Sequence, residues 1–207
     1  MKTAILGVGV DGLTLEQAVE RALRLMDERR GADVCTPNPE MLWLCRRDGT
    51  LRGIVNAADM ILPDGVGVLL GARLLGRPLP ERVTGYDFAC ALMARMHGRV
   101  FLLGGKPGVA ERAARTIRTR FPAATVAGVC DGYSGEDDGL IRRIEAAEPE
   151  LLLVCLGMGK QERFMARLAG NGHIGLMAGL GGTLDVLAGD IPRAPAFFIR
   201  CRLEWLY

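Results

Sequence analysis

Residues 58–88 read ADMILPDGVGVLLGARLLGRPLPERVTGYDF, and the predicted fold is organised around this stretch. The apolar run Met60–Leu62 predicts a buried strand, which Pro63 ends. Asp64 follows directly, and the run from Val66 to Leu75 predicts a helix. In an open α/β sheet, ligands bind beyond the carboxyl ends of the strands. Asp64 is therefore expected at an edge where a carboxylate can face a substrate.

Asp64 has a second interpretation, because Asp is a favoured helix N-cap and the residue could simply start the helix that follows. The loop after that helix is interrupted by prolines and carries the charged residues Arg77, Glu81 and Arg82. Charged loop residues near a strand end suit anion recognition better than core packing. They favour a functional role for Asp64.

The composition excludes several classes of protein. A chain of 207 residues fits one domain with a small appendage, and a net charge of +2 argues against a dedicated nucleic-acid binder. No signal peptide is apparent, and no apolar stretch is long enough to span a bilayer. Six cysteines occur without any C-x-x-C pair and mostly within apolar runs, so we expect reduced core thiols. The chain has only two histidines, which argues against a histidine-based metal site.

Strand-like and helix-like segments alternate along the chain, which predicts an α/β fold. Strands are predicted at residues 3–10, 32–35, 60–62, 99–103, 125–130, 151–156 and 174–179. Helices are predicted after Thr14, which forms a capping box with Gln17, after Asn38, over 66–75 and after Thr84. The alternation predicts a Rossmann-like, mostly parallel sheet with helices on both faces. Right-handed crossovers then place the loops after six of the strands along one edge, in one cleft.

The last residues differ from the rest. Residues 1–195 are expected to form the Rossmann-like domain, and 196–207, AFFIRCRLEWLY, to begin a C-terminal appendage that is truncated here. Its mixture of aromatic and basic residues suits a membrane interface. The alternative is a last helix that packs on the domain or in a subunit contact.

Polar residues follow the strand at 32–35. Residues 36–40 read TPNPE, in which Asn38 and Pro39 are a good N-cap and first-turn pair. One interpretation is only a helix start. The other is that Thr36 and Asn38 point into the same cleft as Asp64.

Turns that contain glycine follow the predicted strands at 99–103 and 125–130. Gly104 and Gly105 open the turn GGKPG, where backbone N–H groups could approach a phosphate, although any tight turn favours glycine. The turn lacks the dinucleotide fingerprint, so a Rossmann dehydrogenase is not predicted. Asp131 and Tyr133 lie in a DGY turn, where the ring could stack on a base or simply pack.

The last two strand ends carry further candidates. Residues 157–162 read GMGKQE, and Lys160 and Gln161 at a helix start could bind phosphate or sugar hydroxyls. Thr183 and Asp185 stand just after the strand at 174–179.

Several of these blocks together resemble the WecG/TagA/CpsF family of bacterial glycosyltransferases. The matching blocks are PDGVG…ERVTGYD, TPNPE, LLGGKPGV, DGY, GMGKQE and GLGGTLDVLAGDIPRAP, which span nearly the whole chain. The family has proline where this chain has Gly159, which loosens that turn. The resemblance implies that Asp64 and Thr36 are catalytic, with Asp64 as the general base. It also implies substrate-binding roles for Asn38, Arg82, Gly104, Gly105, Asp131, Tyr133, Gly157, Lys160, Gln161, Thr183 and Asp185.

The resemblance further implies an inverting transfer of N-acetylmannosamine from UDP-ManNAc to polyprenyl-diphosphate-linked GlcNAc, as in teichoic acid synthesis. The donor could instead be UDP-ManNAcA or UDP-glucose, and a non-catalytic nucleotide-binding domain is the alternative of a different class. Without a D-x-D motif, metal-independent transfer with no cofactor is expected. The expected partners are the UDP-sugar, the lipid acceptor and the inner membrane surface, and a homo-oligomer is an open alternative to a single chain. The expected location is the cytoplasm, peripherally at the inner face of the cell membrane.

Overall fold

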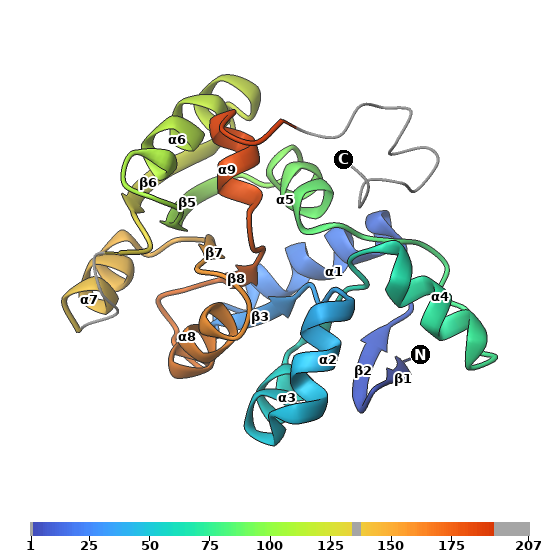
Figure 1. Ribbon diagram of the computed structural model, residues 1–207. Coiled ribbons are helices and arrows are strands. Elements are labelled where there is room, and N and C mark those ends of the chain that lie inside the picture. The colour runs from blue at the N-terminus through green and yellow to red at the C-terminus, as the bar shows by residue number, and fades with distance from the viewer. Residues whose placement is uncertain (1, 134–137, 193–207) are drawn as a thin grey trace.

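The computed structural model describes residues 2–133 and 138–192 (Figure 1). It confirms the predicted α/β fold, with a six-stranded parallel sheet between two layers of helices. The strands are β1 Lys2–Ile5, β2 Val8–Asp11, β3 Ala32–Cys35, β4 Met60–Ile61, β5 Gly98–Gly104, β6 Ala124–Cys130, β7 Leu151–Cys155 and β8 Leu176–Gly179. The helices are α1 Leu15–Asp27, α2 Pro39–Arg47, α3 Gly49–Ala57, α4 Val66–Leu74, α5 Gly85–Met93, α6 Val109–Arg120, α7 Asp138–Ala147, α8 Lys160–Leu168 and α9 Thr183–Ala188.

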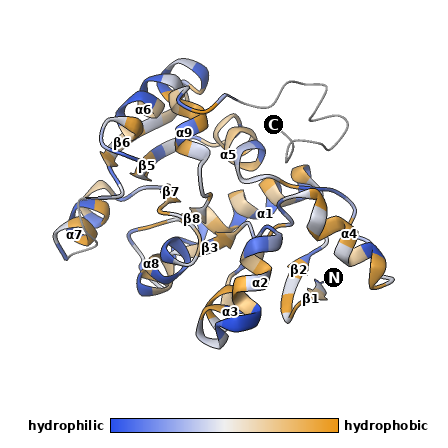
Figure 2. Cartoon of the chain, in the orientation of Figure 1, coloured by the Kyte–Doolittle hydropathy of each residue, from blue (hydrophilic) through white to orange (hydrophobic). Residues whose placement is uncertain are grey.

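The strand order in the sheet is β4-β3-β8-β7-β5-β6. Side chains alternate across it, because successive residues of a strand point to opposite faces. In β7, Leu151 and Leu153 belong to one buried cluster, whereas Leu152 and Val154 belong to the other. The first cluster is completed by α1, α5, α6 and α9, and the second by α2, α3, α4, α7 and α8. In Figure 2, most helices show orange apolar residues beside blue polar ones.

The N-terminal segment corrects the sequence prediction. Residues 3–10 are not one strand: β1 and β2 pair antiparallel as a hairpin outside the parallel sheet. The turn uses positive φ at Leu6 (50°) and Gly7 (86°), as a two-residue hairpin turn requires. Leucine rarely adopts this conformation, so the sequence contains no clear signal for the turn.

The hairpin is fastened to the edge of the sheet by a buried carboxylate. Asp11 Oδ2 accepts a hydrogen bond from the N–H of Ile61 in β4, at 2.9 Å. Asp11 also lies 3.5 Å from Arg21 and 3.7 Å from Lys2. The hairpin therefore satisfies a backbone donor on an edge strand that would otherwise remain open for pairing with another chain.

Most helix starts follow the sequence prediction. The Oγ1 of Thr14 accepts from Gln17 N, and Thr84 Oγ1 accepts from Asp87 N. Helix α3 was not predicted, although Asp48 is its N-cap and accepts from Leu51 N at 2.9 Å. It starts directly where α2 ends, and residues 46–50, RRDGT, separate the apolar positions of the two helices, so Asp48 was an available N-cap signal that the prediction missed.

The predicted segment 196–207 and Cys201 lie outside the described residues. Among residues 2–133 and 138–192, no helix has the length and apolar character needed to cross a bilayer. The five cysteines in this part form no disulfide, and four of them are buried as predicted.

Gly104 at the end of β5 is required by the packing of the sheet. Its φ is +133°, and a Cβ there would lie 2.1 Å from the carbonyl oxygen of Cys155. We predict that Gly104→Ala lowers the free energy of unfolding by at least about 1–3 kcal/mol, the usual cost of such backbone strain. Urea unfolding of the variant and the wild type measures this difference in the free energy of unfolding.

Gly53 provides the matched control, because it is exposed within α3 and a Cβ there would meet nothing within 4 Å. Gly53→Ala should stabilise the protein by about 0.5–1 kcal/mol, since alanine favours a helix over glycine. Equal stability of the two variants would show that the backbone at Gly104 can relax.

Candidate active site

The carboxyl ends of β3, β4, β8, β7, β5 and β6 meet at one edge of the sheet, as parallel pairing requires. The predicted single cleft at this edge is two neighbouring cavities. The first, here called the Asp64 cavity, has a volume of about 160 Å³. It is lined by Thr36, Asn38, Met41, Asp64, Met158, Gln161, Glu162, Leu180, Gly181 and Gly182. The second, here called the lysine cavity, has a volume of about 450 Å³ and is lined by Gly105, Lys106, Gly132, Tyr133, Cys155, Leu156, Lys160 and Asp185.

Asp64 does not cap the helix that follows it. The N-cap of α4 is Gly65, which has no side-chain cap, and Asp64 Oδ2 instead accepts from Gly85 N at the start of α5, at 3.3 Å. Removal from water, with a smaller contribution from the charge of Asp87, raises the pKa of Asp64 to about 6. The Gly85 hydrogen bond and the charge of Arg82 oppose this shift. Asp64 is thus a carboxylate that can exchange a proton near neutral pH.

Thr36 and Asn38 lie beside Asp64 in the same cavity, as predicted. Thr36 Oγ1 donates to the carbonyl of Gly179 at 2.9 Å, which ties the end of β3 to the end of β8. Asn38 Oδ1 accepts from Met41 N at 2.8 Å and so caps α2. Both interpretations of Asn38 therefore hold together: its oxygen caps a helix while its side chain lines the cavity.

Gln161 and Glu162 form the buried wall of the Asp64 cavity. Glu162 accepts from Gly159 N (2.7 Å, Oε2) and from Gln161 Nε2 (2.9 Å, Oε1). Gln161 Oε1 in turn accepts from Gly181 N at 3.1 Å. The chain of hydrogen bonds joins the loop after β7 to the loop after β8. Burial raises the pKa of Glu162.

Gly159 takes part in this arrangement in a way that proline could not. Its φ is +79°, whereas proline is fixed near −65°, and its N–H donates to Glu162. From the sequence, glycine at this position was expected only to loosen the turn. In the structure it also allows a backbone conformation that proline cannot adopt, and its N–H is a hydrogen-bond donor. Glu162 was missed as a site residue, although the GMGKQE block contains it.

Two lysine side chains line the lysine cavity. Lys160 Nζ donates to the carbonyl of Gly132 at 3.3 Å, and the side chain of Lys106 forms no hydrogen bond or ion pair within the described residues. The Gly105 N–H is already bonded to the carbonyl of Cys155, at 3.3 Å. The two ammonium groups of this cavity can bind an anion, and Lys106 was not among the predicted residues.

The other predicted residues lie around the two cavities. Tyr133 is exposed and Asp185 belongs to α9, and both line the lysine cavity. Asp131 Oδ1 accepts from Tyr133 N at 2.8 Å, which holds the turn. Thr183 is buried and donates to the carbonyl of Leu180 at 2.8 Å. Arg82, Gly104, Asp131, Gly157 and Thr183 do not line either cavity.

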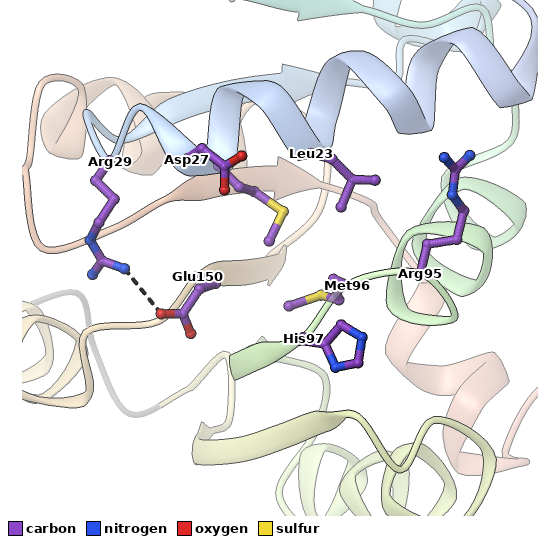
Figure 3. A pocket seen from close by; sticks show the side chains of 8 residues that line it. Leu23, Asp27, Arg29, Arg95, Met96, His97 and Glu150 are labelled. Carbon is purple, nitrogen blue, oxygen red and sulfur yellow. Dashed lines mark hydrogen bonds and ion pairs between the residues drawn. The ribbon is translucent and has the colours of Figure 1, made fainter.

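A third cavity, of about 420 Å³, lies away from this edge, beside the start of β5 and the end of α1 (Figure 3). Arg29 forms an ion pair with Glu150 across it, at 3.0 Å. Glu150 also accepts from Arg99 N, so its carboxylate is occupied by protein donors. Among residues 2–133 and 138–192, no group of three or more His, Cys, Asp or Glu could hold a metal ion.

We predict that Asp64→Asn leaves the protein at least as stable as the wild type at pH 8. The folded pKa of about 6 lies above the ordinary 3.8, so the fold favours the protonated carboxyl. Its contribution to stability is greatest below about pH 4 and declines as the pH rises towards 6. The difference in Tm between variant and wild type should therefore vanish in acid. Asp27→Asn, at an exposed site on α1, is the control. A lower Tm of Asp64→Asn at pH 8 would mean that the charge itself supports the fold.

A second prediction concerns Glu162. Glu162→Ala leaves two donors without acceptors, Gly159 N and Gln161 Nε2, and each orphaned donor costs about 1–3 kcal/mol. Chemical denaturation should show this loss, whereas Glu20→Ala, at an exposed position of α1, should change stability by less than about 0.5 kcal/mol. Comparable values for the two variants would refute the role given to Glu162.

The sequence is similar to those of known proteins. The model of the glycosyl transferase WecG/TagA/CpsF family matches residues 3–207. Three relatives carry the name N-acetylglucosaminyldiphosphoundecaprenol N-acetyl-beta-D-mannosaminyltransferase. Those of Bacillus spizizenii W23 and Bacillus subtilis 168 are 35% and 33% identical over 185 residues, which is 88% of this chain and 72% of theirs. That of Staphylococcus aureus MRSA252 is 31% identical over all of this chain and 83% of its own. The chain therefore belongs to the WecG/TagA/CpsF family of glycosyl transferases.

Proposed function

We propose that the chain transfers N-acetylmannosamine from UDP-ManNAc to polyprenyl-diphosphate-linked GlcNAc, with inversion, in the synthesis of a teichoic-acid-type cell-wall polymer. The observation that carries this proposal is the position of Asp64, with a pKa of about 6, in a small cavity beside a larger one that contains two lysines. The names of the relatives specify the sugar and the type of acceptor.

In the proposed reaction, the Asp64 carboxylate takes the proton of the acceptor hydroxyl. The hydroxyl oxygen then forms a bond to the anomeric carbon of the donor, and the bond from that carbon to the oxygen of UDP breaks. UDP leaves with the bonding electrons. A single displacement of this kind inverts the anomeric centre.

The remaining site residues have supporting roles in this proposal. Lys106 and Lys160 are positioned in the larger cavity to bind a diphosphate and to counter the charge that develops on UDP. The exposed ring of Tyr133, on the rim of the same cavity, is available to stack on a base. Thr36 and Asn38 would orient the sugars beside Asp64. Because the counter-charge comes from lysines, we propose that transfer needs no metal.

The acceptor is a lipid in this proposal, so we place the protein at the inner face of the cell membrane. The described residues contain no spanning helix, and the contact would be peripheral.

The proposal is tested by a donor screen with a short-chain polyprenyl-diphosphate GlcNAc acceptor, read by mass spectrometry of the product. UDP-ManNAc should give product, in the presence of excess EDTA as well, and the rate should rise with pH through about 6 because the base must be ionised. Asp64→Asn should lower turnover roughly 10²–10⁴-fold, whereas Asp27→Asn should not change it.

Other outcomes identify the error. Product from UDP-ManNAcA or UDP-glucose alone would correct the donor. A strict requirement for manganese or magnesium would refute the metal-free mechanism. If no sugar is transferred from any of these donors, the alternative holds, in which the chain is a nucleotide-binding domain without catalytic activity.

A further inference from the structure

Helix α4 presents an apolar surface that the described part of the chain does not cover. Leu70, Leu74 and Leu75 are 53%, 88% and 57% exposed, and together they are here called the α4 apolar patch. Leu70 and Leu74 lie one turn apart on the same side of the helix. Figure 2 shows this orange end of α4 at the outer edge of the molecule. Adjacent exposed leucines of this kind mark an interaction surface more often than single ones do.

The opposite side of α4 explains why the helix is nevertheless held in place. Val68 and Ala72 are buried in the core cluster, and Gly71 lies against Ile5 of β1. The leucines of the patch are therefore not needed for the packing of α4. The buried side of α4 holds the helix on the domain, so the exposed leucines are available to contact another surface.

The charged residues of α4 and of the loop that follows it, up to residue 80, are all positive. Residues 65–80 contain Arg73 and Arg77 and no Asp or Glu. Both arginines are exposed, and neither side chain forms an ion pair within the described residues. Apolar side chains next to unpaired arginines suit a surface with an apolar interior and anionic groups at its boundary, as a bilayer has.

A neighbouring helix carries the same combination. Trp43 on α2 is 50% exposed, and the guanidinium groups of Arg46 and Arg47 lie 5.7 and 5.3 Å from its ring centre. Tryptophan with arginine is typical of the boundary between lipid and water. Glu40, in the first turn, is the acidic residue of this helix. The net charge of α2 is accordingly positive as well.

Both helices start at the Asp64 cavity. Asp64 stands two residues before α4, Asn38 caps α2, and both residues line that cavity. Pro39, the first residue of α2, lies directly against Gly67 in the first turn of α4. Figure 1 shows the two helices on the same side of the molecule. A lipid that approaches between these helices would bring its head group to Asp64.

We propose that α4, with α2 beside it, is the surface by which this protein lies on a bilayer that contains anionic lipids. The α4 apolar patch and Trp43 enter the boundary region, and Arg73 and Arg77 contact lipid phosphates. The identity of the lipid substrate rests on the function proposed above, whereas the membrane contact itself does not. A second copy of the chain fits this surface less well than a bilayer does. In a symmetric contact the arginines of the two copies would face each other, and residues 65–80 contain no acidic residue to pair with them.

The test is co-sedimentation of the full chain with vesicles of phosphatidylglycerol and phosphatidylcholine at equal amounts, against vesicles of phosphatidylcholine alone. Leu70→Ser with Leu74→Ser should weaken binding at least tenfold, since burial of one leucine is worth about a factor of ten. Arg73→Gln with Arg77→Gln should weaken binding to the anionic vesicles by roughly fivefold for each arginine, and less at high salt.

Matched controls lie on other parts of the surface. Arg115→Gln with Arg118→Gln removes two exposed arginines from α6, and Ile191→Ser removes an exposed apolar side chain beyond α9. These variants should bind vesicles as the wild type does. Thermal unfolding should show unchanged Tm values for the α4 variants, because the substituted side chains are largely exposed.

Three results would overturn the proposal. The α4 variants could bind vesicles as tightly as the wild type. The leucine variant could change the mass of the particle in solution and not its vesicle binding, which would make the patch a contact between copies. Phe197→Ser with Phe198→Ser could abolish binding while the α4 variants retain it, which would place the anchor in the C-terminal segment.

Transfer to a short-chain, water-soluble acceptor separates this proposal from the proposed function. The α4 variants should retain wild-type turnover on that acceptor, because no bilayer is involved. A wild type that binds vesicles through α4 but transfers no sugar would refute the function and leave the membrane surface intact. The reverse result would refute the membrane surface alone.

Discussion

The parallel pairing of β3 with β4 on one side and with β8 on the other is the constraint from which the active site follows. Parallel strands bring their carboxyl ends to the same edge, so residues distant in the chain become neighbours there. Thr36 follows β3, Asp64 follows β4, and Gly181 follows β8. The hydrogen bond from Thr36 to Gly179 joins two of these ends directly. Loss of this register would separate the residues of the Asp64 cavity.

The Asp64 cavity is lined by two carboxylates with different roles, the buried Glu162 and the half-buried Asp64. Glu162 accepts from two protein donors and holds the loops after β7 and β8 together. From the described residues, the Asp64 carboxylate accepts one hydrogen bond, from Gly85, and the surrounding residues remove much of it from water. Two donors make a carboxylate a structural element, whereas a single donor with a raised pKa leaves proton transfer possible near pH 6. The number of donors, rather than burial alone, distinguishes the two residues.

The fold was largely predictable because apolar runs, prolines and helix caps act locally. The caps at Thr14, Asn38 and Thr84 form as the residue types predict. The predictions failed in two places. Local rules do not decide the hairpin turn, where Leu6 adopts a left-handed conformation that leucine rarely takes. Helix α3 was missed although it has a local signal, since Asp48 is a favoured N-cap within the polar run 46–50 that separates α2 from α3.

The sequence by itself determined the fold class, the six strand ends and the residues that stand at them, because chain order and residue type suffice for these. Only the tertiary structure decided which of these residues share a cavity and what each one contacts. It divided one expected cleft into two, bonded the Gly105 N–H to Cys155 and brought Lys106 and Lys160 together. The physical reason is that a hydrogen-bond partner or a pKa depends on atoms far away in the chain. For Asp64, removal from water by the surrounding residues raises the pKa most, and Gly85, Arg82 and Asp87, which lie on a later segment, modify it.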